Sequence, residues 1–186
     1  MACDLTLGRK EPCKDSVGGI KEVYFVNFGD LGAITYDSTD TDVIDAIAGT
    51  PSAYKYEVRG NSSFTQNIQS SEETGTTAFE QVVELTLKRL TKEDHKEIKL
   101  LAFGRPHMMV VDHNDNVFLA GLDNGMQVTG GTIVTGAAMS ELSGYTLTLS
   151  GMERLPANFL AKVTEEPPSL GAVDIAAVGF SIEEAS

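Results

Sequence analysis

The chain contains no tryptophan and only two cysteines, Cys3 and Cys13, among its 186 residues. These cysteines do not form a C-x-x-C pair, and no histidine or further cysteine lies near them to complete a set of metal ligands. A disulfide framework would need more cysteines and an oxidising compartment. We therefore expect two free thiols, and neither a cysteine-based metal site nor a disulfide-stapled fold.

Basic residues are scarce, because 14 Lys and Arg stand against 27 Asp and Glu and give a formal net charge of −13. A protein that coats nucleic acid or adheres to an anionic membrane needs cationic groups facing the phosphates. The chain also lacks a run of ~20 apolar residues and a basic-then-apolar leader. We therefore expect a protein made in the cytoplasm that neither coats nucleic acid nor enters a membrane.

Motifs that carry chemistry are absent as well. The sequence has no Gly-x-Ser-x-Gly elbow and no phosphate-binding glycine loop, and its three histidines, His95, His107 and His113, lack metal-ligand spacing. Acidic residues are abundant, but no feature singles out two of them as a general acid and base. The sequence therefore predicts no catalytic, cofactor-binding or metal-binding residues, and a protein that is not an enzyme.

One short run imitates a calcium-binding loop. Asp112, Asn114 and Asn116 follow the spacing at the start of an EF-hand, but Val117 stands where that loop requires glycine. The flanking residues are typical of strands and not of helices. Because Asn and Asp side chains stabilise turns by bonding to nearby backbone, the run predicts a hairpin turn.

The pattern that is present is a series of short strands separated by turn residues. Such segments are rich in β-branched and aromatic residues or alternate apolar with polar ones. A polar stretch at 60–77 is consistent with the tip of a long hairpin, and 34–36 and 43–48 fit short strands or, for the second, a helical turn. The clearest strands are predicted over 20–28, 54–59, 79–87, 108–111, 117–120, 126–134 and 145–151.

A single helix is predicted over 91–103. Thr91 is a good N-cap, Asp94 lies where a capping box carries its acid, and Gly104 with Pro106 ends the element. Many strands and one helix predict a mainly β protein, a β-sandwich or open barrel with one packed α-helix. The chain length fits one domain over 20–160, with an N-terminal arm at 1–19 and a C-terminal arm at 161–186.

Charges are segregated along the chain. Three segments contain acidic but no basic residues, namely those between Lys21 and Lys55, between Arg59 and Lys88, and between Arg105 and Arg154. Six of the 14 basic residues lie within 88–105, in and around the predicted helix. An acidic solvated surface accounts for this pattern, and the sharper hypothesis is that one face of the protein is held negative.

Alternation indicates which residues form such a face. In 79–87 one side carries Phe79, Val83, Leu85 and Leu87, and the other carries Glu80, Val82, Glu84 and Thr86. In 145–151 the polar side carries Thr146, Thr148 and Ser150. Faces built from hydroxyls and carboxylates repel phosphate and offer it no cation. They suit a surface along which DNA slides without being bound.

These features resemble a tail tube protein of a long-tailed bacteriophage, also called a major tail protein, over about residues 20–160. The resemblance is carried by the strand-rich layout, the polar hairpin, the Glu-containing strand, the helix that ends in LLAFG, and the closing segments GMQVTGGT and GYTLTLSGME. It implies subunits that form hexameric rings stacked into a hollow tube in the virion tail, assembled in the host cytoplasm. The subunits line an electronegative lumen with β-strands. Double-stranded DNA passes through without specific binding, and other tail and neck proteins are partners.

Carried onto this chain, the resemblance assigns two sets of residues. The expected lumen-facing residues are Glu80, Glu84, Thr86, Thr146 and Thr148, with Asp37, Asp40, Asp42 and Asp45 as a second set. The expected contacts between subunits are Phe64, Ile68, Glu72, Glu73, Val178, Phe180 and Ile182. For the last three, a final strand in the same core is an equal alternative.

Two other classes of function remain open from the sequence. Other virion components, such as capsid-decoration, connector and tail-terminator proteins, share the strand-rich and acidic character. A ligand-binding β-domain is the remaining alternative. The absence of tryptophan argues against a carbohydrate ligand, because sugars stack on aromatic rings.

Overall fold

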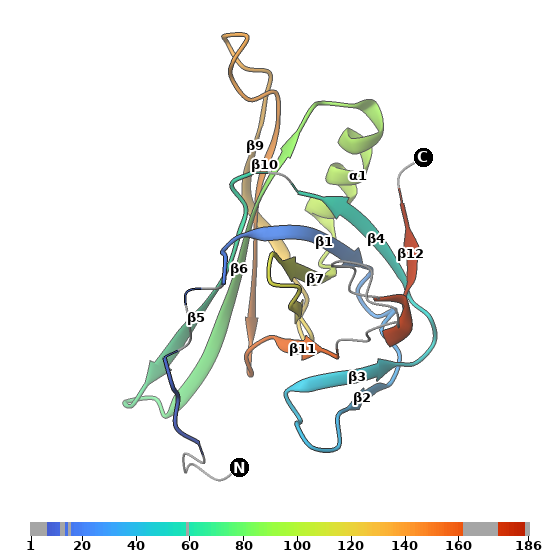
Figure 1. Cartoon of the computed structure of the whole chain (residues 1–186). Helices are drawn as coiled ribbons and strands as arrows, with labels where there is room; N and C mark the ends of the chain where they lie inside the picture. Colours follow the sequence, from blue (N-terminus) through green and yellow to red (C-terminus); the bar gives the residue numbers. More distant parts are fainter. Residues whose placement is uncertain (1–6, 12–13, 15, 59, 162–174, 185–186) are drawn as a thin grey trace.

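The computed structural model describes residues 7–11, 14, 16–58, 60–161 and 175–184, which form strands, one α-helix and one short 3₁₀ helix (Figure 1). In chain order the elements are β1 (Ile20–Val26), β2 (Ile34–Tyr36), β3 (Val43–Ile47), β4 (Ser52–Glu57), β5 (Ser63–Ser71), β6 (Thr76–Lys88), α1 (Lys92–Phe103), β7 (His107–Asp112), β8 (Val117–Ala120), β9 (Gln127–Val134), β10 (Gly144–Glu153), β11 (Asn158–Leu160), η1 (Ala176–Val178) and β12 (Ser181–Glu183).

The strands form two sheets. The larger has the order β12-β4-β1-β7-β8-β11-β3-β2, and the smaller has the order β5-β6-β10-β9. Most neighbours pair antiparallel, but β12 with β4 and β11 with β3 pair in parallel. The predicted mainly β fold with one packed helix is therefore confirmed, as two open sheets of a sandwich and not a closed barrel.

The main core lies between the two sheets. The alternation predicted for 79–87 is confirmed, because Val83 and Leu85 are buried whereas Glu84 is exposed. Each buried aliphatic side chain contributes about 1.5–3 kcal/mol to stability by leaving water. The inner residues of the small sheet pack on those of the large one, and the cluster includes Val23, Phe25, Val83, Leu85, Met108, Val110, Leu147 and Leu149.

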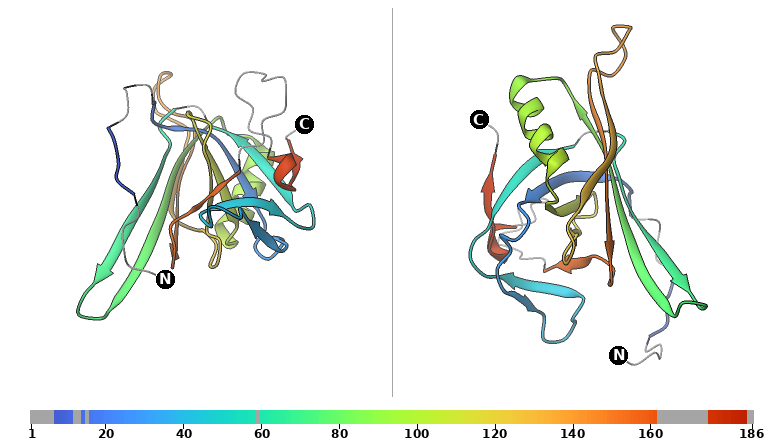
Figure 2. Two further views of the ribbon diagram at one scale, coloured as in Figure 1. Left: turned by 60° about the horizontal axis from the view of Figure 1, so that its bottom comes forward. Right: turned by 180° about the vertical axis from the view of Figure 1, so that it is seen from behind.

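A second core lies on the other face of the large sheet. That sheet curls, so residues of β3 share a cluster with residues of β1 and β8 (Figure 2). Ile175, Val178 and Phe180 fill this cluster and are only 1–3% exposed, and β12 adds a parallel strand beside β4. The described part of the predicted C-terminal arm is therefore part of the domain. Residues 162–174 and 185–186 lie outside the described residues.

The helix is found where its cap predicted it. The Thr91 hydroxyl accepts a hydrogen bond from the backbone N of Asp94 at 3.0 Å, which satisfies one of the free N–H groups of the first turn. Gly104 closes the helix by donating to the Leu100 carbonyl. Ile98 is buried in the main core and Leu101 packs against it, so α1 covers one end of the sandwich.

The two ends of the molecule carry different elements. The helix α1 and the β9–β10 loop lie at one end, and the β2–β3 hairpin and the tip of the β5–β6 hairpin lie at the other (Figures 1 and 2). The stretch predicted as a hairpin tip, 60–77, is largely the strand β5, which pairs with β6 from Ser63 to Ser71. Only residues 72–75 form the turn.

The described residues of the N-terminal arm are exposed and have no regular secondary structure. Val17 is held by Asn114, whose side-chain oxygen accepts from the Val17 N–H at 3.0 Å and whose amide donates to the Val17 carbonyl at 2.7 Å. The arm is thus tied to the turn that follows β7. Both cysteines, Cys3 and Cys13, lie outside the described residues.

Candidate functional site

The strand register brings the first set of predicted site residues together. Glu84 lies opposite Thr148, and Thr86 lies opposite Thr146, in the antiparallel pair of β6 and β10. Glu80 lies two residues before Val82 on the same side of β6, because side chains alternate along a strand. All five therefore point away from the main core, on the outer face of the four-stranded sheet.

Hydroxyls and amides extend this outer face across the whole sheet. Glu80 accepts hydrogen bonds from the side-chain amides of Asn67 at 3.4 Å and Gln69 at 3.1 Å, both on β5. At the other side, the hydroxyls of Thr132 and Thr146 lie 2.6 Å apart across β9 and β10. The face is thus mostly polar and uncharged around two carboxylates, with Val82 and the exposed Met152 as apolar members.

The charge of this face has one sign along most of its length. Glu80 and Glu84 are its carboxylates, and Lys88, at the end of β6, is the one basic residue in the four strands. No ion pair involves Glu80 or Glu84 within the described part of the chain. A phosphate backbone approaching this face would meet like charge and hydroxyls, and would find no cation along most of it.

Sequence reasoning missed the contribution of β5 to this face. Ser63, Thr65, Asn67 and Gln69 pair with even-numbered residues of β6 and so share the side that carries Glu80 and Glu84. The signal was present in the sequence as alternation within the polar stretch. Only Phe64 and Ile68 are large and apolar there, however, which was too little to assign a strand.

The second predicted acidic set lies on the other sheet, so the fold does not bring it together with the first set. Asp37, Asp40, Asp42 and Asp45 belong to the β2–β3 hairpin, at the far edge of the large sheet. Asp37 accepts from the backbone N of Thr39 at 2.6 Å and of Asp40 at 3.1 Å, and Asp40 accepts from the backbone N of Asp42 at 3.0 Å. The two backbone donors hold the pKa of Asp37 below its usual value. Asp37 and Asp40 therefore stabilise the turn of the hairpin, and all four carboxylates make the hairpin negatively charged.

The residues predicted for subunit contacts divide into two groups. Val178 and Phe180 are buried in the second core, which is the alternative that the sequence left open. Phe64 packs against the main core, with its ring 5.7 Å from that of Phe118, so it is an internal contact. The exposed group consists of Ile68, Glu72, Glu73 and Ile182.

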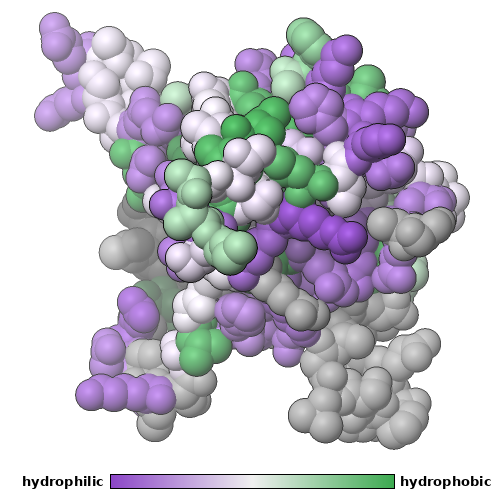
Figure 3. Space-filling model, turned by 90° about the horizontal axis from the view of Figure 1, so that it is seen from above, coloured by the Kyte–Doolittle hydropathy of each residue, from purple (hydrophilic) through white to green (hydrophobic). Residues whose placement is uncertain are grey.

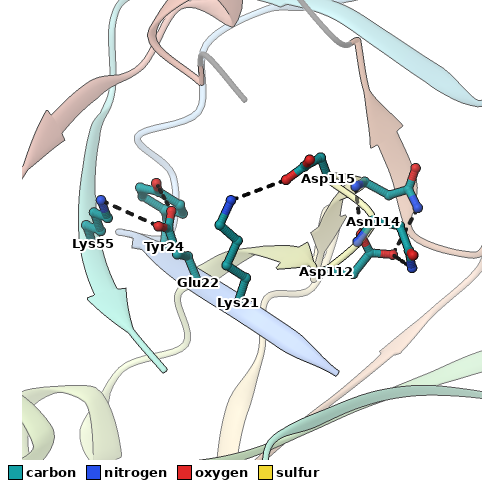
Figure 4. Close-up of polar contacts among 8 residues, drawn as sticks. Lys21, Glu22, Tyr24, Lys55, Asp112, Asn114 and Asp115 are labelled. Carbon is teal, nitrogen blue, oxygen red and sulfur yellow. Dashed lines mark hydrogen bonds and ion pairs between the residues drawn. The ribbon is translucent and has the colours of Figure 1, made fainter. Parts of the chain in front are cut away.

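The run that imitates a calcium loop is a hairpin turn, as predicted. The Asp112 carboxylate accepts from the backbone N–H groups of Asn114 and Asn116, both at 2.8 Å, and from both of their side-chain amides (Figure 4). The neighbouring Asp115 forms an ion pair of 3.3 Å with Lys21 (Figure 4). The carboxylates that a calcium ion would need in this loop therefore already bond to other groups of the protein. Over the described residues, no group of three or more His, Cys, Asp or Glu is placed to hold a metal ion.

Comparisons with protein-family models, curated proteins and solved structures gave no match to this chain. Among the described residues, α1 is too short and too polar to cross a membrane. The outer face of the four-stranded sheet and the exposed tip of the β5–β6 hairpin are therefore the features on which a function can be argued.

Proposed function

We propose that the chain is a structural subunit that assembles into stacked hexameric rings, the tail tube of a long-tailed bacteriophage, and that this tube is a conduit for DNA delivery. One observation carries the proposal: a four-stranded sheet with one face in the core and the other face built mostly from hydroxyls, amides and two carboxylates. A surface that meets DNA without holding it requires this composition.

The sheet is also suited to continue from one subunit to the next. Its outermost strands, β5 and β9, each have one edge that pairs with no other strand among the described residues. An unpaired strand edge is a template for pairing with another chain. Six copies joined through these edges would form a closed β-barrel whose inner surface is the outer face described above. Glu80, Glu84, Thr86, Thr146 and Thr148 would then face the lumen.

The β5–β6 hairpin supports contacts beyond one ring. Its tip reaches past the body of the sandwich (Figure 2). Ile68 lies on the side of the hairpin that faces the core nearer the base, yet it is 69% exposed because the large sheet does not cover it. With Glu72 and Glu73 in the turn, this tip is the proposed contact to a neighbouring ring.

Negative-stain electron microscopy of the purified full chain tests the proposal. We expect hexameric rings, or tubes of stacked rings, to appear as the protein concentration rises. A capsid-decoration protein would instead remain small by itself and bind capsids. A chain that stays monomeric at every concentration in light scattering, and gives no ring in micrographs, would contradict the tube function.

A further inference from the structure

The outer face of α1 is exposed to solvent in the part of the chain that the structure describes. Lys92, Lys96, Lys99, Leu100 and Phe103 are spaced i, i+4, i+7, i+8 and i+11, so they lie along one side of the helix. Ile98, on the opposite side, is buried. We call these five residues the helix stripe. Its two apolar members are unusually open to solvent, with Leu100 58% and Phe103 84% exposed.

The helix stripe is positively charged. Its three lysines are exposed, and none of them forms an ion pair within the described residues. Glu93 and Glu97 lie on one flank of the helix and outside the stripe. Viewed from the end that carries α1, the surface shows apolar patches next to hydrophilic ones (Figure 3). A surface that combines lysines with exposed leucine and phenylalanine is suited to contact an acidic partner that also carries an apolar group.

The opposite end of the same molecule offers such a surface. The β2–β3 hairpin carries Asp37, Asp40, Asp42 and Asp45, and no basic residue occurs between Lys21 and Lys55. No ion pair neutralises these four carboxylates in the described part of the chain. Tyr36, beside them, is 41% exposed and supplies an aromatic ring. The hairpin is therefore complementary to the helix stripe in charge and in apolar character.

We propose that the helix stripe of one copy binds the β2–β3 hairpin of a second copy. The inference rests on the proposed function and deepens it, because it names the surfaces that stack one subunit on the next. The two surfaces lie at opposite ends of the molecule (Figures 1 and 2). A contact between two different surfaces of identical copies is head-to-tail. When its surfaces lie at opposite poles it repeats along a line, so it builds a stack.

The contact brings together opposite charges that are otherwise unpaired, and it covers Leu100 and Phe103. Complementary charge fixes the register of such an interface and speeds encounter more than it adds affinity. Like charges placed across the same interface would oppose stacking. Charge reversal on each side therefore separates this contact from an indirect effect on folding.

Two charge-reversed full-length variants test the contact. The helix variant is Lys96→Glu with Lys99→Glu, and the hairpin variant is Asp42→Lys with Asp45→Lys. Asp37 and Asp40 are left in place because they hold the turn. The control variant, Asp123→Lys with Glu183→Lys, changes exposed carboxylates outside both surfaces. Circular dichroism checks that all of them fold.

We expect each test variant alone to need at least about tenfold more protein to form stacks than the unmodified chain or the control. The hairpin variant removes the net charge of the hairpin, and the helix variant places negative charge opposite the aspartates, so neither keeps the attraction across the contact. An equimolar mixture of the two test variants should stack again, since each reversed surface then meets a surface of opposite charge. Normal stacking by either variant alone, or a mixture that does not regain stacking, would overturn the proposed contact. The proposed tube function would not be affected by either result. An unmodified chain that forms neither rings nor stacks would overturn the proposed function together with it.

Discussion

His107 is a buried residue whose protonation state is set by its surroundings. The residue is 3% exposed, and its ring stacks on that of Phe28 at 4.9 Å between centroids. Nδ1 lies 2.6 Å from the Gly121 carbonyl, to which it donates, and Nε2 accepts from the backbone N of Gly29 at 3.4 Å. One nitrogen donates and the other accepts, so the ring is neutral. Burial lowers the pKa of His107, and the nearby Arg105 adds to this, against opposing effects of the Gly121 carbonyl and Asp30.

We therefore expect stability to fall as pH decreases below ~6.5, the ordinary pKa of histidine. Because the folded pKa is depressed, the unfolded chain takes up the proton first, and the loss is at most about 1.4 kcal/mol per pH unit. Urea unfolding between neutral and mildly acidic pH measures this slope. The His107→Gln variant should lose it, whereas His113→Gln, which changes an exposed histidine, should keep it. If the stability of His107→Gln fell with pH as steeply as that of the unmodified chain, the pH dependence would not come from His107.

Asp112 is the residue on which the β7–β8 turn depends. Hydrogen bonds from Asn116 and Asn114 outweigh the effect of burial and hold its pKa below the usual value. Asp112→Ala should cost about 2–3 kcal/mol at neutral pH, because four donors lose a charged acceptor. The cost should shrink as pH falls below ~3.9, where the carboxyl of the unfolded chain becomes protonated before that of the folded protein. Chemical unfolding at neutral and acidic pH measures both. The exposed Asp123→Ala should cost under about 0.5 kcal/mol at either pH.

At the scale of elements, the local signals in the sequence were sufficient for the helix and for the strands with a clear apolar alternation. The capping residue Thr91 and the alternation through Val83 and Leu85 act over a few positions, so they are legible without tertiary structure. The boundary between β5 and the turn that follows it could not be predicted. Polar residues occupy both faces of this hairpin where it extends beyond the large sheet, so no alternation marks the strand. The parallel pairs of β12 with β4 and of β11 with β3 join segments distant in sequence, which no local pattern specifies.

The segment that contains η1 and β12 makes a prediction of its own. Phe180 is 3% exposed within the second core, so Phe180→Ala should destabilise the isolated subunit by about 3–5 kcal/mol. Ile182→Ala, on the half-exposed side of β12, should cost under about 1 kcal/mol. Denaturant unfolding of the monomer measures both. A segment that ordered only on assembly would leave monomer stability unchanged in Phe180→Ala, and that result would contradict the packing described here.

At the scale of the whole molecule, the net charge of −13 is unevenly distributed over the surface. One end carries the lysines of α1, the other carries the aspartates of the β2–β3 hairpin, and the outer face of the small sheet carries Glu80 and Glu84. The sequence revealed the segregation but not its geometry, because two acidic segments that look alike belong to different sheets. Only the strand order shows that Glu80 and Glu84 lie on the small sheet and the four aspartates at the edge of the large one.

Reversing the charge of the outer face gives the decisive test of that surface. Glu80→Lys with Glu84→Lys should leave folding and tube assembly intact, because both side chains point away from the core. The tubes should then bind double-stranded DNA at least about tenfold more tightly at low salt, since new cations face the phosphates, and virions that carry the variant should release DNA more slowly. Asp123→Lys with Glu183→Lys adds the same charge elsewhere and should change neither. Tubes that bind no more DNA than this control, or a double variant that cannot assemble, would show that Glu80 and Glu84 do not face the lumen.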